Sequence, residues 1–149
     1  MKHPTILLIE DNPDDVELTL RAFREQTLEV HVEVARDGAE AIECLAADSA
    51  THDGQWPPHV ILLDLNLPKL SGIEVLRHIR SHTETQRLPV IVLTTSNDAQ
   101  ERSRCYEIGA SSFIRKPVAY ERFMEVIKQL GIYWTDINMP PPHAERPYA

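Results

Sequence analysis

Five short apolar runs alternate with longer amphipathic segments, and this alternation constrains the fold more than any other feature of the sequence. The runs are rich in Val, Ile and Leu, which is typical of buried strands. Each is followed by a segment with apolar residues three or four positions apart, which is typical of a helix packed on one side. The predicted strands are residues 5–10, 30–35, 60–64, 89–94 and 112–116. The predicted helices are residues 13–26, 37–48, 71–82, 97–109 and 119–131.

This order predicts an α/β protein built on one parallel sheet. Strands that are apolar along their whole length need cover on both faces, and the intervening helices provide it. A chain of 149 residues suits a single domain with one core. Because the crossovers in such a sheet are right-handed, the carboxyl ends of the strands and their loops gather at one edge.

Polar residues are concentrated where the predicted strands end. The stretch "VILLD" runs apolar from Val60 and stops on Asp64, a carboxylate that is costly to bury without a partner. The other polar residues near strand ends are Glu10 and Asp11 after the first strand, Asn66 after the third, Thr94, Thr95 and Ser96 after the fourth, and Lys116 after the fifth. We expect these side chains to meet at one edge of the sheet.

Three carboxylates at one edge repel each other unless a cation lies between them. Glu10, Asp11 and Asp64 offer oxygen donors with no Cys or His beside them, which favours Mg²⁺, or a similar hard ion such as Mn²⁺, over zinc. Lys116 adds a point charge and Thr94 a hydroxyl for a phosphate bound to the same ion. The residues therefore predict a site that holds a phosphoryl group on or near an aspartate, since carboxylates accept phosphoryl groups in covalent catalysis.

At this point the sequence resembles the receiver domains of two-component response regulators. The matching stretches are "LLIEDN", "VILLDLNLPKLSG", "PVIVLTTS" and "SFIRKP", and they span residues 5–131. The resemblance implies a flavodoxin-like (βα)5 doubly wound parallel sheet in the strand order 2-1-3-4-5. It also implies a signalling switch and not an enzyme. A sensor histidine kinase would phosphorylate the domain in a Mg²⁺-dependent reaction and so change its partner binding, with only slow autocatalytic gain and loss of phosphate.

The resemblance gives each residue at the sheet edge a role. Asp64 is the phosphoacceptor, and the metal ligands are Glu10, Asp11, Asp64 and Asn66, with Glu10 acting through water and Asn66 through its backbone carbonyl. The phosphoryl-binding and switch residues are Thr94, Lys116 and Phe113, and the Lys116–Pro117 bond is expected to be cis. Glu10 stands where many members carry Asp, and Thr95 where many carry Ala, but neither change removes a required group.

We expect residues 132–149 to form a C-terminal extension beyond a receiver domain of residues 1–131, and we expect no effector domain. The stretches "LDLNLPK" and "VLTTS" and an aromatic, proline-rich tail resemble stand-alone receivers paired with bacterial phytochrome kinases, which implies a bacteriophytochrome as the sensor kinase. The tail is too apolar for an ordinary linker. Its residues Ile132, Tyr133, Trp134 and Ile137 predict an arm that holds a homodimer.

Composition weighs against several other functions. The formal net charge of -8 opposes nucleic-acid binding, and no apolar stretch is long enough to cross a membrane. Cys44 and Cys105 both fall in predicted helices, so we expect free thiols and a cytoplasmic protein. His78 and His82 have ligand spacing, but without a third partner a solvated helix face is the better interpretation.

Two other classes of protein bind phosphate on a fold of this kind. A metal-dependent aspartyl phosphatase stays as the alternative, although such enzymes need an acid two residues after the nucleophile, where this chain has Asn66. A flavin- or nucleotide-binding domain needs a phosphate loop after the first strand, and "EDNPDD" repels phosphate instead.

Overall fold

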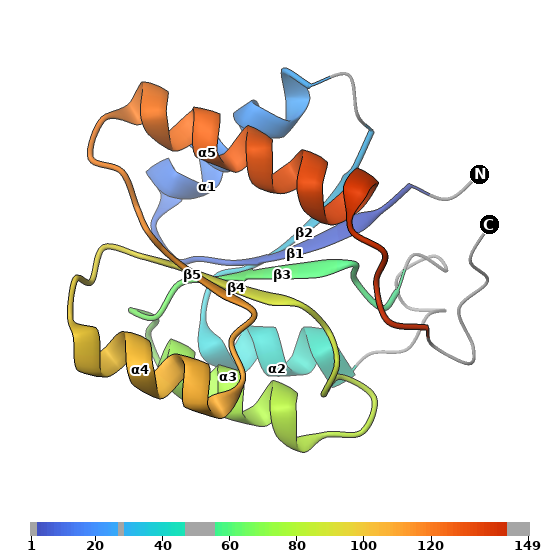
Figure 1. The fold of residues 1–149 in the computed structure, drawn as a ribbon, viewed down its shortest axis with the longest axis vertical. Helices are drawn as coiled ribbons and strands as arrows, with labels where there is room; N and C mark the ends of the chain where they lie inside the picture. Colours follow the sequence, from blue (N-terminus) through green and yellow to red (C-terminus); the bar gives the residue numbers. More distant parts are fainter. Residues whose placement is uncertain (1–2, 27–28, 47–55, 143–149) are drawn as a thin grey trace.

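A computed structural model describes residues 3–26, 29–46 and 56–142 of the chain (Figure 1). The strands are β1 (Thr5–Ile9), β2 (His31–Ala35), β3 (Val60–Leu63), β4 (Val90–Thr94) and β5 (Ser112–Arg115). The helices are α1 (Pro13–Arg24), α2 (Gly38–Ala46), α3 (Gly72–Ser81), α4 (Ala99–Ile108), α5 (Tyr120–Ile132) and the π-helical turn η1 (Tyr133–Ile137). The ten predicted strands and helices are therefore confirmed, although the predicted end of the second helix at residue 48 lies outside the described residues.

The five strands form one parallel sheet in the order β2-β1-β3-β4-β5, as the resemblance implied. β1 lies between β2 and β3, pairing Leu7 with both Glu33 and Ile61. β4 joins the other side of β3, with Ile91 opposite Leu62, and β5 forms the far edge. The strand order reverses direction between β1 and β3. Sheets of this class bind ligands at this point of reversal, just outside the carboxyl ends of the strands.

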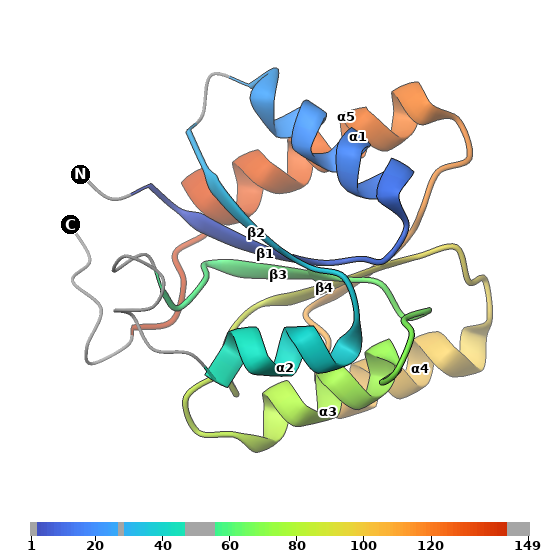
Figure 2. The same ribbon diagram turned by 180° about the vertical axis from the view of Figure 1, so that it is seen from behind.

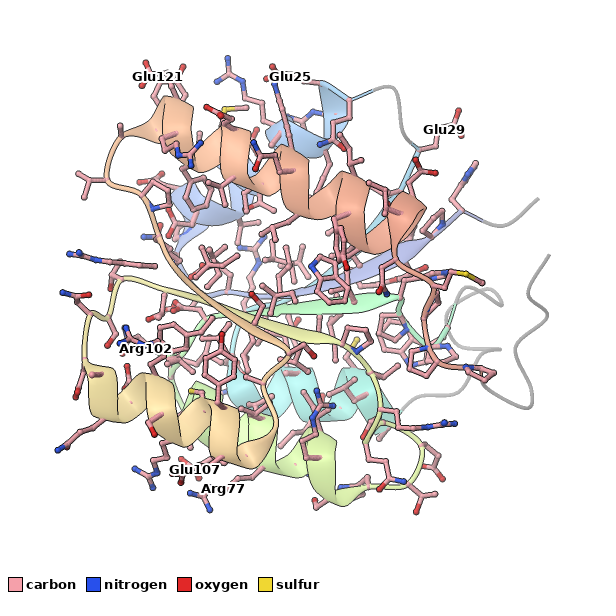
Figure 3. All side chains as sticks on the ribbon, in the orientation of Figure 1. Glu25, Glu29, Arg77, Arg102, Glu107 and Glu121 are labelled. Atoms are coloured by element: carbon pink, nitrogen blue, oxygen red, sulfur yellow. The ribbon has the colours of Figure 1, made fainter. Side chains whose placement is uncertain are left out.

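Helices cover both faces of the sheet. α1 and α5 lie on one face, and α2, α3 and α4 lie on the other (Figures 1 and 2). Alternate residues of each central strand point to opposite faces, so Ile6 and Leu8 pack under α1 and α5 while Leu7 and Ile9 pack toward α2 and α3. Charged side chains such as Glu121, Arg77 and Glu107 point outward from the helices (Figure 3).

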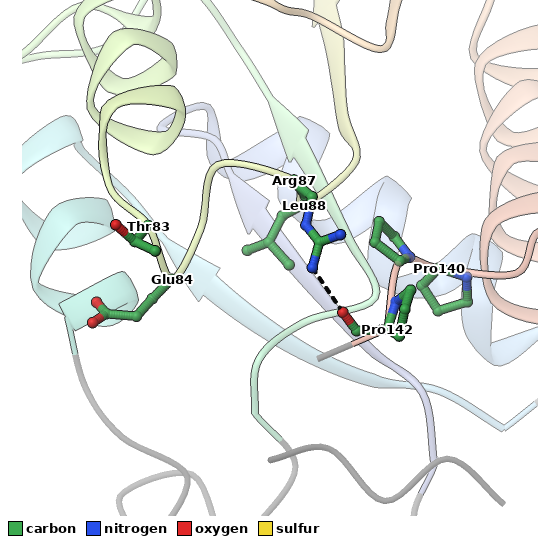
Figure 4. A pocket seen from close by; sticks show the side chains of 7 residues that line it. Thr83, Glu84, Arg87, Leu88, Pro140 and Pro142 are labelled. Atoms are coloured by element: carbon green, nitrogen blue, oxygen red, sulfur yellow. Dashed lines mark hydrogen bonds between the residues drawn. The ribbon is translucent and has the colours of Figure 1, made fainter. Parts of the chain in front are cut away.

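The C-terminal segment folds back on its own domain. α5 continues into η1, where the half-buried Trp134 packs against the core beneath α1 and α5. The chain then crosses toward the loop between α3 and β4, where Arg87 donates a hydrogen bond of 3.0 Å to the carbonyl of Pro142 (Figure 4). This path lies near the amino-terminal ends of the strands, opposite the loops that follow their carboxyl ends (Figure 1).

Two features of the described residues concern the tail and the prolines. Trp134, assigned from the sequence to a dimer arm, is here partly covered by its own domain, while Ile132, Tyr133 and Ile137 remain exposed. The cis peptide bond found in the described residues joins Trp56 to Pro57, so the expected cis bond before Pro117 is not present in this structure. A trans bond before proline is the ordinary preference, by roughly 0.5–1 kcal/mol.

None of the described helices has both the length and the apolar character that a membrane span requires.

Candidate functional site

Asp64 is fixed by the strand that precedes it and by the loop that follows. Its backbone N–H donates to the carbonyl of Ile9 (3.0 Å), which extends the pairing of β3 with β1 by one residue. The residue is only 7% exposed. The following loop turns back at once, because the N–H of Gly72 donates to the carbonyl of Leu65 (2.9 Å). The carboxylate is therefore held in the protein at the carboxyl end of a central strand.

Glu10 and Asp11 bring two more carboxylates to Asp64. The N–H of Glu10 donates to the carbonyl of Ala35 (3.0 Å), and the residue is 3% exposed, whereas Asp11 is exposed. One carboxylate oxygen from each of the three acids lies within 4.8 Å of the others. The predicted acidic cluster is therefore brought together by the fold.

The donor set fits a hard cation. Its three residues offer only carboxylate oxygens, which suit Mg²⁺ or Mn²⁺ and not the soft ions that thiolates select. One side of the set, at Asp11, is open to solvent, which suits an ion that keeps part of its water shell. Asn66 is exposed nearby, and its backbone N–H donates to Asp64 Oδ1 (3.4 Å).

Lys116 places its ammonium among these acids. Its side chain is 6% exposed, and Nζ lies 2.6 Å from Glu10 Oε1 and 3.5 Å from Asp64 Oδ2. Its backbone N–H donates to the carbonyl of Thr94 (2.7 Å), which holds the end of β5 against the end of β4. The lysine therefore reaches the site from the far edge of the sheet, as predicted.

Asp15 also binds the ammonium of Lys116, a contact that was not predicted from the sequence. Asp15 Oδ2 lies 2.8 Å from Lys116 Nζ. Asp15 stands in the first turn of α1, where an acid is explained equally well by the helix dipole. Only the fold shows that this turn faces the lysine, so no sequence signal separates Asp15 from its neighbour Asp14.

Burial and crowding shift two protonation equilibria in the site. Burial raises the pKa of Glu10 to about 7; the hydrogen bond from Lys116 opposes this rise, and the nearby Asp64 adds to it. Burial alone would lower the pKa of the Lys116 ammonium, but its hydrogen bonds to Asp15 and Glu10 outweigh that effect and raise it. The site therefore keeps a charged lysine and contains more negative charge than one ammonium satisfies.

The remaining predicted residues flank this cluster. Thr94 is fully buried at the end of β4, and its hydroxyl accepts a hydrogen bond from the N–H of Ser96 (3.2 Å). Thr95, where many receivers carry Ala, is exposed. Phe113 is half-buried on β5 and packs against the core on the α2–α4 face. Thr94 therefore lies at the carboxyl edge of the sheet, and Phe113 lies farther back along β5.

Comparison with known proteins identifies the family. The family model described as "Response regulator receiver domain" matches residues 6–128. This chain belongs to the response regulator receiver domains. The match covers β1 except for Thr5, the other four strands in full and most of α5, so the acids, Thr94 and Lys116 all lie inside the receiver domain.

Similar proteins include other regulators of about the same length. FilR2 of Methanothrix harundinacea, described as a probable methanogenesis regulatory protein, is 35% identical over 136 residues, which are 91% of this chain and 86% of that protein. Response regulator Rcp1 of Synechocystis sp. is 30% identical over 136 residues, covering 91% of this chain and 92% of Rcp1.

Solved structures agree with this assignment. The crystal structure of the phosphorylated cyanobacterial phytochrome response regulator RcpA has a TM-score of 0.86 and 33% identity, covering 94% of this chain and 99% of RcpA. The structure of the Mn²⁺-bound form of Rcp1 has a TM-score of 0.85 and 29% identity, covering 93% of this chain and 99% of that one. The receiver domain described here is thus a component of two-component signalling, and its close neighbours include phytochrome-associated regulators.

Proposed function

We propose that this receiver domain accepts a phosphoryl group on Asp64 from a sensor histidine kinase. One observation carries the proposal. The buried Asp64 carboxylate lies 3.5 Å from the ammonium of Lys116 and shares a cluster with Glu10 and Asp11 whose oxygens lie within 4.8 Å of one another. An anionic nucleophile beside a lysine and a ready cation site is the arrangement that phosphoryl transfer to a carboxylate needs.

The chemistry at Asp64 requires no general base. One carboxylate oxygen forms a bond to phosphorus while the bond between phosphorus and the donor breaks, and that electron pair leaves with the donor. The carboxylate has no proton to lose, so the site needs charge neutralisation and alignment. Lys116, 6% exposed, supplies a positive charge that is little screened by water.

A divalent cation completes the proposed reaction. Glu10, Asp11 and Asp64 would hold it, together with the backbone carbonyl of Asn66, and the ion when bound neutralises charge on the phosphoryl oxygens. The Mn²⁺-bound form known for the similar Rcp1 supports Mg²⁺ or Mn²⁺ as the ion. The phosphorylated form known for RcpA supports the reaction.

Thr94 and Phe113 form the proposed switch. The Thr94 hydroxyl now accepts from the N–H of Ser96, and its own proton is available to a phosphoryl oxygen on Asp64. A shift of Thr94 toward that oxygen would leave space behind β4, into which the half-buried Phe113 can turn. The outcome is a changed surface near α4 and β5, to which partners respond.

The proposed partners are a sensor histidine kinase and a second copy of this chain. A bacteriophytochrome is the kinase that the similarity to RcpA favours. The homodimer would form through the large hydrophobic residues Ile132, Tyr133 and Ile137, which are 41%, 47% and 61% exposed. Trp134 would support this surface from within its own domain, since it already packs against the core.

Intact-protein mass spectrometry after incubation with acetyl phosphate and Mg²⁺ tests the function. Wild-type protein should gain one phosphoryl group, and Asp64→Asn should gain none because it keeps the shape but loses the nucleophile. Asp14→Asn is the matched control, since it removes an exposed carboxylate from the neighbouring first turn of α1. Equal labelling of the Asp64 and Asp14 variants would show that another residue accepts the phosphoryl group.

A further inference from the structure

Lys116 has one acidic partner that the proposed reaction does not use. Its ammonium contacts Glu10 at 2.6 Å, Asp15 at 2.8 Å and Asp64 at 3.5 Å. Glu10 and Asp64 belong to the candidate cation site, and Asp64 is the proposed phosphoacceptor. Asp15 belongs to neither, although its side chain is four-fifths buried, at 21% exposure.

Asp15 is held in place by the start of α1. The Asn12 side chain caps this helix by accepting hydrogen bonds from the N–H groups of Asp14 (2.9 Å) and Asp15 (3.4 Å). The hydroxyl of Thr19 donates to the carbonyl of Asp15 (2.7 Å). The N–H of Asn12 donates in turn to Glu10 Oε2 (3.3 Å), so the helix cap and the acid cluster form one connected structure. The backbone that carries the Asp15 carboxylate is thus held in place.

A cation and the lysine compete for Glu10. A divalent ion bound by Glu10, Asp11 and Asp64 repels an ammonium that lies 2.6 Å from a Glu10 oxygen. Lys116 must then give up part of its contact with Glu10, and a buried ammonium without a carboxylate is strongly disfavoured. Asp15 offers a carboxylate on the α1 side of the lysine, outside the three-acid cluster.

We propose that Asp15 is the positioning residue for Lys116, the carboxylate that keeps the ammonium in the site when Glu10 and Asp64 engage a cation and a phosphoryl group. This inference rests on the proposed function for its role in phosphoryl transfer, but its contacts are independent of that reaction. Asp15 does not touch the reacting atoms; it acts through Lys116. Without Asp15, the lysine remains on Glu10 and hinders the cation.

A calorimetric titration with MgCl₂ tests this proposal in the full-length chain. Asp15→Asn should weaken Mg²⁺ binding by at least about threefold relative to Asp14→Asn, within the range of coupling seen between interacting groups. Both variants remove one charge from the first turn of α1, but the exposed Asp14 carboxylate makes no ion pair in the described part of the chain. Equal affinities for the two variants would overturn the proposal.

A double-mutant cycle separates an effect through Lys116 from a direct effect of the Asp15 charge. In a Lys116→Met background, Asp15→Asn should change Mg²⁺ affinity no more than Asp14→Asn does. A threefold loss that persists without the lysine would mean that Asp15 attracts the ion directly, and the proposal would be wrong.

Should Lys116→Met fail to fold, the NMR signals of the Lys116 ammonium decide the question. They should persist on adding MgCl₂ to wild type and to Asp14→Asn, because a carboxylate still shields the ammonium from exchange with water. They should be lost in Asp15→Asn, and signals that persist in that variant overturn the proposal.

Acetyl phosphate labelling of wild type tests the proposed function separately from these experiments. If wild type is never labelled, the proposed function is wrong, while the MgCl₂ titrations still decide the role of Asp15.

Discussion

Gly72 packs against the backbone of Asp64 so closely that a Cβ atom at this position would lie 2.4 Å from the Asp64 carbonyl oxygen and 2.5 Å from Leu65 Cα. Both atoms belong to the backbone that carries the proposed phosphoacceptor. Since neither can move without shifting Asp64, the glycine at the start of α3 fixes how tightly the loop after β3 turns back. The position of the carboxylate thus depends on a residue eight positions later in the chain.

Gly72→Ala should therefore destabilise the protein by about 1–3 kcal/mol, the usual cost of overpacking. Gly131→Ala is a useful comparison, because its Cβ would meet a side chain, the Phe23 ring at 2.7 Å, and not the backbone of the site, and because Ala favours a helix over Gly. Urea denaturation should rank Gly72→Ala well below Gly131→Ala. A Gly72→Ala variant as stable as wild type would show that the loop relaxes easily.

Asp11→Ala should weaken Mg²⁺ binding by at least about tenfold, or roughly 1.4 kcal/mol. Asp11 is the exposed member of the cluster, and removing it leaves two carboxylates, both of them in contact with Lys116, for an ion that loses its water reluctantly. Isothermal titration calorimetry measures the change, with Asp14→Ala as the control for a lost charge near the start of α1. Similar affinities for Asp11→Ala and Asp14→Ala would exclude Asp11 as a ligand.

Cys44 should react slowly with iodoacetamide in the folded protein. Burial, together with the nearby Glu33 and Glu40, raises the pKa of its thiol from 9.0 to about 11, so the reactive thiolate is roughly a hundredfold rarer at pH 8 than for an ordinary thiol. The folded state favours the neutral thiol, so this contribution to stability is present in full below about pH 9 and is lost as the pH rises from there through about 11. Labelling rates with and without urea check the prediction, and equal rates would contradict it.

The fold was predictable because burial leaves a direct mark on the sequence. Apolar runs such as residues 60–63 can only be covered by helices on both faces, and the alternation supplies those helices. The site was largely predictable for the same reason, since parallel strands bring Glu10, Asp64 and Lys116 to one edge whatever the details of packing.

Asp15 and the course of the tail were not predictable in this way. The contact of Asp15 with Lys116 joins residues 101 positions apart and depends on how far α1 is rotated about its axis. Local patterns do not set this rotation. The tail has a proline-rich stretch without periodicity, and its docking through Arg87 depends on where the loop between α3 and β4 happens to lie. Side-chain contacts between distant elements are set by tertiary packing, which a single sequence encodes only indirectly.

The dimer surface can be tested without removing the tail. A truncation after Gly131 would also remove Trp134, which covers part of the core, so a loss of dimer would be mixed with a loss of stability. The paired substitution of Ile132 and Ile137 by Ser removes exposed apolar surface and leaves Trp134 in place.

If the proposed homodimer forms, light scattering at tens of micromolar should show wild type as a dimer and the Ile132→Ser, Ile137→Ser variant as a monomer. These conditions require an association free energy of roughly 7 kcal/mol, and two aliphatic side chains supply a few kcal/mol of it when buried, at about 25 cal/mol per Å².

Val118→Ser is the matched control, because Val118 is 98% exposed but lies in the loop between β5 and α5. It should remain a dimer, since that loop lies at the opposite end of α5 from the two isoleucines (Figure 1). A wild type that is already monomeric would leave the exposed residues at the end of α5 free to contact the kinase instead.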